Sequence, residues 1–176
     1  FNIGKWHLSG TFYCRKYKII SLEIINSLKP HIYIDIGCGL GELLSKVKIS
    51  KEFKIGYDKD IEISKVNLKL RKNKFEYFTQ EENLIKYVNK LDIPPNKQII
   101  ISMLNFLHNL SIKELKAKIN NYQKKLGSFL LLVDNIYDKG EEYFFNHHEF
   151  LFNHRGLIKY MHKVDKLRSL YLIKID

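Results

Sequence analysis

Predicted strands and predicted helices alternate along the whole 176-residue chain, and this alternation limits the fold more than any other feature. Apolar, β-branched runs predict strands, and apolar residues at helical spacing predict helices. The predicted helices cover 19–28, 41–47, 61–70, 79–88, 112–126 and 141–152. The predicted strands cover 31–36, 53–57, 75–79, 98–102, 128–133, 157–164 and 170–175. Such alternation favours a parallel sheet with helices on its faces.

The last two predicted strands are joined by the short stretch DKLRS, which has the length of a hairpin connection. We therefore expect an α/β fold with a doubly wound, mainly parallel seven-stranded sheet and an antiparallel hairpin at its C-terminal end. No linker, repeat or low-complexity stretch indicates a second domain. The expected organisation is an N-terminal lid or cap segment, residues 1–16, followed by one domain over 17–176.

Helix-capping patterns support two of the predicted helices. Ser111 and Glu114 have capping-box spacing, as do Thr79 and Glu82. Gly127 stands where a helix that ends at Leu126 would take its C-cap. These patterns predict where both helices begin and where one of them ends.

The stretch IDIGCGLGELL, residues 34–44, joins the first predicted strand to a helix through three glycines at alternate positions. Glycine permits backbone angles and a close approach to a ligand that a side chain would block. A dinucleotide site has a third glycine where this chain has Glu42, at the helix end that would receive pyrophosphate. Asp35 adds a second acid just before the first glycine. The loop therefore favours a ligand with a positive centre and no pyrophosphate.

The run Asp35-Ile36-Gly37-Cys38-Gly39-Leu40-Gly41 resembles motif I of class I S-adenosylmethionine (SAM)-dependent methyltransferases, whose pattern is acid-x-G-x-G-x-G. SAM carries a positive sulfonium and ammonium. In this family an acid at the end of the second strand holds the ribose hydroxyls. Asp58 in KIGYDKD matches that position, with Asp60 as the alternative. The order of elements also matches the family over about residues 15–176.

The resemblance implies SAM as cofactor, S-adenosylhomocysteine (SAH) as product, and a set of cofactor-binding residues. Asp35 and the three glycines would line the methionine side, Cys38 being a small residue of the same loop. Thr79 and Gln80 occupy the adenine position after the third strand, without the acid that is usual there. Ser102 to Asn105 would line the methyl-donor side. The expected cofactor-binding residues are Asp35, Gly37, Cys38, Gly39, Gly41, Asp58, Thr79, Gln80, Ser102 and Met103.

Two cysteines, Cys14 and Cys38, are too few for a disulfide framework, and this favours a reducing compartment. The sequence has no apolar run long enough to span a bilayer and no secretory signal pattern. A cytoplasmic location is therefore expected.

The formal net charge of +11 has two interpretations that stay open. An anionic partner, such as nucleic acid or a phosphorylated metabolite, would explain it. So would compositional drift, because the basic residues are mostly lysines, whereas forked recognition of phosphates and bases favours arginine. The arginines are Arg15, Arg71, Arg155 and Arg168.

Several acceptor classes of the family are disfavoured by the residues after the fourth strand. SMLNFLHN, residues 102–109, lacks the Asn/Asp-Pro-Pro-aromatic run of enzymes that methylate nucleobase amino groups. It also lacks the cysteine of cytosine C5 methylation. Catechol-type metal-dependent enzymes carry acids after strands four and five. Asp134-Asn135 matches the second place, but Ser102 stands near the first, so we expect no metal.

A metal-free O-methyltransferase needs a base near neutral pH, and histidine supplies one. The candidate catalytic residues are His108 and His7. The alternative role for His108 is packing at the start of a helix.

The aromatic segment GKWHLSGTFYCRKY, residues 4–17, is a candidate lid that includes Tyr13, or else packs against the sheet's helices. The run HHEFLFNH, residues 147–154, is a helix face or an acceptor contact; its spacing matches no common zinc pattern. The candidate acceptor-binding residues are Trp6, Arg15, Asn105, His147 and His148.

The combined interpretation is a SAM-dependent methyltransferase acting on a small polar acceptor, with O-methylation of a saccharide or phosphorylated metabolite favoured. An RNA methyltransferase that uses the basic surface is the alternative. A third possibility is a methyltransferase-like binding subunit without activity.

Overall fold

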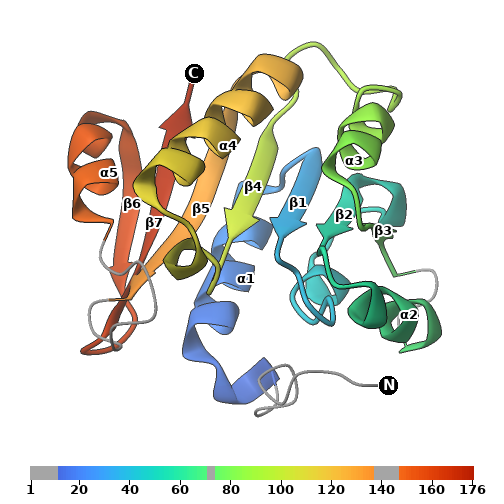
Figure 1. Ribbon diagram of the computed structural model, residues 1–176, viewed down its shortest axis with the longest axis horizontal. Helices are drawn as coiled ribbons and strands as arrows, with labels where there is room; N and C mark the ends of the chain where they lie inside the picture. The colour runs from blue at the N-terminus through green and yellow to red at the C-terminus, as the bar shows by residue number, and fades with distance from the viewer. Residues whose placement is uncertain (1–11, 71–73, 137–146) are drawn as a thin grey trace.

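The computed structural model describes residues 12–70, 74–136 and 147–176 and contains one seven-stranded sheet (Figure 1). The strand order is β3-β2-β1-β4-β5-β7-β6. The first five strands are parallel, and β7 pairs antiparallel with both β5 and β6. The strands are β1 Ile32–Ile36, β2 Lys54–Tyr57, β3 Glu76–Phe78, β4 Ile99–Met103, β5 Phe129–Ile136, β6 Ile158–Lys163 and β7 Arg168–Ile175. The predicted sheet with its C-terminal hairpin is confirmed.

Helices cover both faces of the sheet (Figure 1). One core cluster joins the central strands to α3, α4 and α5, and a second joins them to α1. The α-helices are α1 Lys16–Leu28, α2 Ile61–Leu70, α3 Glu81–Val88, α4 Ile112–Leu126 and α5 His148–Asn153. Short 3-10 helices are η2 Phe12–Cys14, η3 Leu44–Lys46, η4 Lys51–Phe53, η5 Leu107–Asn109 and η6 Arg155–Leu157. No helix of the described ranges is both long enough and apolar enough to cross a membrane.

Strand β1 shows why the sheet is enclosed on both faces. Its five residues are all buried. Because successive side chains of a strand point to opposite faces, Ile34 joins the cluster with α3 and α4, while Tyr33 joins the cluster with α1. A parallel strand covered on both faces reads as a continuous apolar run, which IYI and III at the start of β1 and β4 show, before the buried polar Asp35 and Ser102 near their carboxyl ends.

The helix predicted over residues 41–47 is wrong. Only the 3-10 helix η3 forms there, and the chain is extended again at Val47. The Ser45 hydroxyl donates a hydrogen bond to the Glu42 carbonyl (2.9 Å), and such local side-chain bonds compete with a regular helix. The Lys48 N–H is bound by the Asn26 side chain of α1 (2.9 Å), outside any helical pattern.

One of the two predicted capping boxes forms. At the start of α4, Ser111 accepts a hydrogen bond from the Glu114 N–H, and the Glu114 carboxylate accepts one from the Ser111 N–H. The C-cap of α4 is Gly127, as predicted. The Thr79 box is wrong, because α3 begins one residue later, with Gln80 as its N-cap and no side-chain capping bond.

The structure describes the N-terminal segment from Phe12 onward, and one of its side chains reaches the core. Phe12 is buried in the same cluster as α1, while Tyr13 is exposed. Helix α1 begins at Lys16, next to the expected boundary between segment and domain. Trp6 and His7 lie outside the described residues.

Candidate functional site

The carboxyl ends of the central strands meet at one edge of the sheet. In the strand register, Asp35 of β1 lies beside Gly56 of β2 and Ser102 of β4. Because β7 is antiparallel, its first residue, Arg168, lies at the same edge, opposite Ile136 of β5. In doubly wound sheets, ligands bind at this edge, near the point where the strand order reverses.

The glycine loop after β1 has the backbone that its sequence requires. Gly37, Gly39 and Gly41 have φ angles of 72°, 53° and 61°, in the left-handed region that favours glycine. The N–H groups of Gly37 and Cys38 donate to the Tyr57 carbonyl of β2 at 2.8 and 3.1 Å, which anchors the start of the loop to the neighbouring strand.

Asp58, directly after β2, holds the middle of this loop. Its Oδ2 accepts a hydrogen bond from the Gly39 N–H (3.0 Å), and its Oδ1 accepts one from the Asp60 N–H (3.1 Å). Asn67 of α2 donates to the Gly39 carbonyl (2.6 Å). Asp60 instead caps α2, accepting from the Glu62 and Ile63 N–H groups. Asp58 is therefore the acid that contacts the glycine loop.

Asp35 is a buried carboxyl at the base of the loop. The Ser102 hydroxyl donates to Asp35 Oδ1 (2.6 Å), and the buried Tyr33 hydroxyl lies 2.7 Å from the same serine oxygen. Because Ser102 gives its proton to Asp35, Tyr33 is the donor to Ser102. Burial raises the pKa of Asp35 to about 6, although the Ser102 hydrogen bond and the Lys18 charge oppose the rise.

Two cations of the N-terminal part balance the charge of Glu42. Lys18 Nζ lies 2.6 Å from Glu42 Oε2, and Arg15 Nη1 lies 3.7 Å from the same oxygen. Burial lowers the pKa of Lys18, and its hydrogen bond to Glu42 opposes this. Glu42 therefore does not present the open negative charge that the sequence alone suggested, and Asp35 is the acid of the loop that remains for a cation.

A cavity of about 990 Å³ opens at this edge, between the glycine loop, the start of α1 and the residues after β4. Eight of the candidate cofactor-binding, catalytic and acceptor-binding residues line it: Arg15, Asp35, Gly37, Cys38, Gly39, Asp58, Asn105 and His108. They come from four separate segments, and the fold brings them into one site.

Other predicted site residues lie elsewhere. Gly41 packs against Phe75, where an added Cβ would approach the ring to 2.1 Å. Met103 is buried in the core, and Ser102 lies behind Asp35. Thr79 and Gln80 follow β3 and are not among the residues that line the cavity; the Gln80 side chain accepts from Asn83.

The two histidines predicted as acceptor contacts lie near α5. His147 is buried, and its Nε2 lies 2.8 Å from the Leu107 carbonyl, so the structure gives it a contact with η5 instead of a place on the cavity wall. His148 is the first residue of α5.

The pair Asp134-Asn135 at the end of β5 is engaged in protein contacts rather than arranged as a metal site. Asp134 Oδ2 lies 3.2 Å from Arg168 Nη1, and only 1% of the Asp134 side chain is exposed. Asn135 accepts a hydrogen bond from the His147 N–H (3.2 Å). The described ranges contain no group of three or more His, Cys, Asp or Glu side chains that would hold a metal ion.

Several cavity-lining residues were missed at the level of the sequence. The guanidinium of Arg168 lies over the Tyr17 ring, 4.1 Å from its centroid, and its Nη2 donates to Asn105 Oδ1 (3.2 Å). Burial raises the pKa of Tyr17, which keeps its hydroxyl protonated. Tyr17 precedes the helix predicted over 19–28, and no local pattern identifies Arg168 as part of the site. The missed lining residues include Tyr17, Lys18, Tyr57, Lys118 and Arg168.

Comparison with known proteins supports the fold at low sequence identity. No family model matches the chain, and no curated protein matches it. The methyltransferase domain of bacterial CtHen1-CN has a TM-score of 0.63 at 13% identity, over 91% of this chain and 98% of that one. Magnesium protoporphyrin IX methyltransferase (ChlM) from Synechocystis PCC 6803, with bound SAM, has a TM-score of 0.63 at 11% identity, over 92% of this chain and 79% of that one.

The N-methyltransferase NodS from Bradyrhizobium japonicum WM9, in complex with SAH, has a TM-score of 0.64 at 12% identity, over 96% of this chain and 90% of that one. These likenesses, with the strand order and the C-terminal hairpin, show that the chain has the class I methyltransferase fold.

Proposed function

We propose that this chain is a SAM-dependent methyltransferase that methylates an oxygen of a small polar acceptor, such as a saccharide or a phosphorylated metabolite. The observation that carries the proposal is the placement of Asp35, the glycine loop and Asp58 on one cavity at the carboxyl ends of adjacent strands. The structural neighbours named above include proteins with bound SAM or SAH, which supports the choice of cofactor.

The residues of the site fit the polar groups of SAM. Asp35 offers a buried carboxylate to the ammonium, and the Ser102 hydroxyl donates a hydrogen bond to one of its two oxygens. Each Asp58 oxygen accepts one backbone N–H and has a second lone pair for a ribose hydroxyl. Gly37 and Gly39 let the backbone approach the ligand closely.

SAM would supply a methyl group already activated by the sulfonium, so the protein has to align the acceptor and take up its proton. His108, on η5 at the cavity wall, is the side chain we assign to proton removal. The Tyr17 hydroxyl, kept protonated by its raised pKa, would donate a hydrogen bond to the acceptor.

The charges around the cavity favour a small acceptor over a nucleic acid backbone. Four of the cations that line it contact acids of this chain: Arg15 and Lys18 with Glu42, Lys118 with Glu81, and Arg168 with Asp134. A cation already paired in this way gains less from a phosphate than an unpaired one. RNA methylation remains the second candidate because of the net charge of +11.

The test is methyl transfer from SAM labelled in its methyl group, with purified protein and two acceptor pools: total RNA, and a small-molecule extract that contains nucleotide sugars. We expect label in the small-molecule pool, and the mass of the product would identify the acceptor. Label in RNA alone would replace the leading proposal with the second. If SAM and SAH fail to bind in calorimetry, the chain is the inactive binding subunit instead.

Asp58→Ala supplies the site-specific variant for the binding measurement. We expect it to weaken SAM binding by about 1–3 kcal/mol, the scale of hydrogen bonds to a charged group. Asp92→Ala, at an exposed position outside the cavity lining, is the matched control and should bind SAM like the wild type. Equal affinity of Asp58→Ala and wild type would remove Asp58 from the site.

A further inference from the structure

The loop between β4 and α4, residues 104–110, decides which side chains face the glycine loop. Asn105 has a φ of 54°, in the left-handed region that asparagine adopts more readily than other residues with a side chain. The next residue, Phe106, lies directly over Gly37, where an added Cβ would approach its ring to 2.5 Å. His108 follows on η5 and lines the cavity. Contacts that fix this loop therefore bear on where His108 lies in the cavity.

One support comes from Asp134 of β5. Its Oδ1 accepts a hydrogen bond from the Asn105 N–H (2.7 Å), at the residue with the left-handed backbone. Arg168 pairs with the other oxygen of Asp134 at 3.2 Å and donates to Asn105 Oδ1, so it contacts both partners. The Tyr17 ring supports the guanidinium from α1.

A second support comes from the neighbouring residue, Asn135. Its side-chain oxygen accepts from the His147 N–H (3.2 Å), and His147 Nε2 lies 2.8 Å from the Leu107 carbonyl, which is an acceptor. His147 is therefore the donor, with its proton on Nε2. This contact holds η5 at the residue just before His108.

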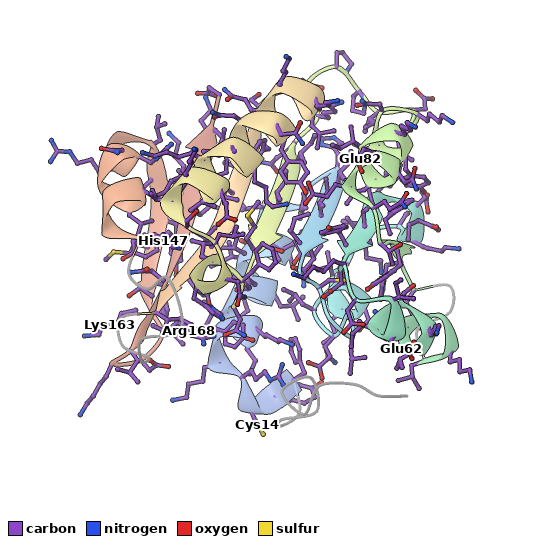
Figure 2. All side chains as sticks on the ribbon, viewed as in Figure 1. Cys14, Glu62, Glu82, His147, Lys163 and Arg168 are labelled. Atoms are coloured by element: carbon purple, nitrogen blue, oxygen red, sulfur yellow. The ribbon has the colours of Figure 1, made fainter. Side chains whose placement is uncertain are left out.

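The two supports reach the loop from opposite faces of the sheet. Successive residues of a strand point to opposite faces, and the neighbours of the pair confirm this. Leu132 packs in the cluster with α1, and Val133 packs in the cluster with α3, α4 and α5. Asp134 shares the face of Leu132, and Asn135 shares the face of Val133. His147 and Arg168 are both labelled in Figure 2.

We propose that Asp134 and Asn135 are positioning residues that hold the loop 104–110 from both faces of the sheet, through Arg168 and His147, and so set the place of His108 in the cavity. The pair resembles a metal-ligand pair in sequence, yet its oxygens are committed to an N–H, a guanidinium and a second N–H. The inference concerns the position of His108 and holds whichever acceptor the site takes.

The test uses one variant for each support and reads the environment of His108 directly. Arg168→Lys keeps a cation beside Asp134 but removes the fork that also reaches Asn105. His147→Phe keeps a ring of similar size but removes the N–H that binds Leu107. The matched controls are Arg155→Lys, at an exposed arginine, and His154→Phe, whose imidazole contacts the Phe150 carbonyl within α5.

The readout is the side-chain NMR signal of His108, assigned by its loss in His108→Gln, over a pH titration. We expect a changed chemical shift and a changed titration midpoint in both test variants but in neither control.

An unchanged His108 signal in both folded test variants would overturn the proposal and leave the pair with a role in stability alone. If Arg168→Lys does not fold, the double variant Asp134→Asn/Arg168→Met, which removes both charges, provides the same measurement. Failure of the proposed function would instead appear as absence of SAH binding to the wild type, and it leaves the His108 readout unaffected.

Discussion

At the scale of single residues, the buried Asp35 is the acid that the proposed function assigns to the ammonium of SAM. Its carboxyl lies under the glycine loop, where few groups stabilise its charge, and this raises its pKa to about 6. The same burial makes the carboxylate a strong partner for a positive ligand, because water does not compete for it. The buried carboxylate therefore lowers the stability of the protein at neutral pH, and under the proposed function it contributes affinity for the ammonium of SAM.

A pH titration and Asp35→Asn test this link. Since the folded pKa is raised from 3.8, the folded state holds the proton more tightly, so the free energy of unfolding falls as pH rises from about 4 to about 6. Asp35→Asn removes the ionisable group and with it this fall in the free energy of unfolding. We expect the variant to raise the free energy of unfolding at pH 7 by about 1–3 kcal/mol in urea denaturation.

The same variant should bind SAM at least about tenfold more weakly at pH 7, because the ammonium loses its charged partner. Wild-type affinity should fall as pH drops through about 6, whereas the affinity of Asp35→Asn should stay nearly flat there. A wild-type affinity that is independent of pH between 5 and 7 would contradict the assignment of Asp35 to the ammonium.

His108 is the residue at which catalysis is expected to separate from cofactor binding. We expect His108→Ala to lower kcat by at least about 100-fold with the acceptor found in the labelling experiment, the usual contribution of a positioned base. SAM affinity should remain similar. His162→Ala, on the β6 hairpin strand, is the matched control. Normal turnover of His108→Ala across the pH range would exclude a base at this position.

At the scale of elements, the glycine loop depends on a backbone that other residues rarely adopt. Gly41 combines a φ of 61° with an approach of 2.1 Å between an added Cβ and the Phe75 ring. We expect Gly41→Ala to lower the free energy of unfolding by about 2–4 kcal/mol and to weaken SAM binding with it. Gly156→Ala, in η6 with open space around it, should change neither in thermal denaturation or calorimetry. A fully stable Gly41→Ala would show that the loop tolerates a side chain.

The elements themselves could be predicted from the sequence because their signals are local. Apolar runs predicted all seven strands, and Ser111, Glu114 and Gly127 predicted the ends of α4. The errors arose where short-range side-chain contacts compete with the regular helix that the pattern predicts. The Ser45 side chain contributes to replacing a helix with η3, and α3 takes Gln80 rather than Thr79 as its N-cap.

Only the part of the site that lies in short sequence motifs could be predicted. Asp35, Asp58 and the glycines lie beside strands whose order the alternation implies. Arg168 could not be found in this way, since it meets Asn105 across 63 positions of the chain and no spacing rule connects them. His147 has the chemistry of a ligand contact, but its burial against Leu107 depends on tertiary packing.

At the scale of the whole molecule, the open question is whether the charge of +11 serves a nucleic acid partner. We expect only non-specific RNA binding, with a Kd above roughly 1 µM at physiological salt and a steep loss of affinity as salt increases. Fluorescence anisotropy with a labelled single-stranded RNA measures both. Tight binding that resists salt and depends on Arg15 or Arg168 at the cavity would support RNA as the acceptor.

The strand order also has a consequence for how the protein is made. During synthesis, β1 to β5 emerge first and already contain Asp35, Asp58 and Ser102, whose contacts join the parallel strands. Arg168 emerges only with β7, which must insert between β5 and β6. Contacts between distant parts of a chain form slowly, because a long loop must close first. The cofactor side of the site is therefore expected to take shape before the loop that carries His108, so that binding competence precedes catalytic competence during folding.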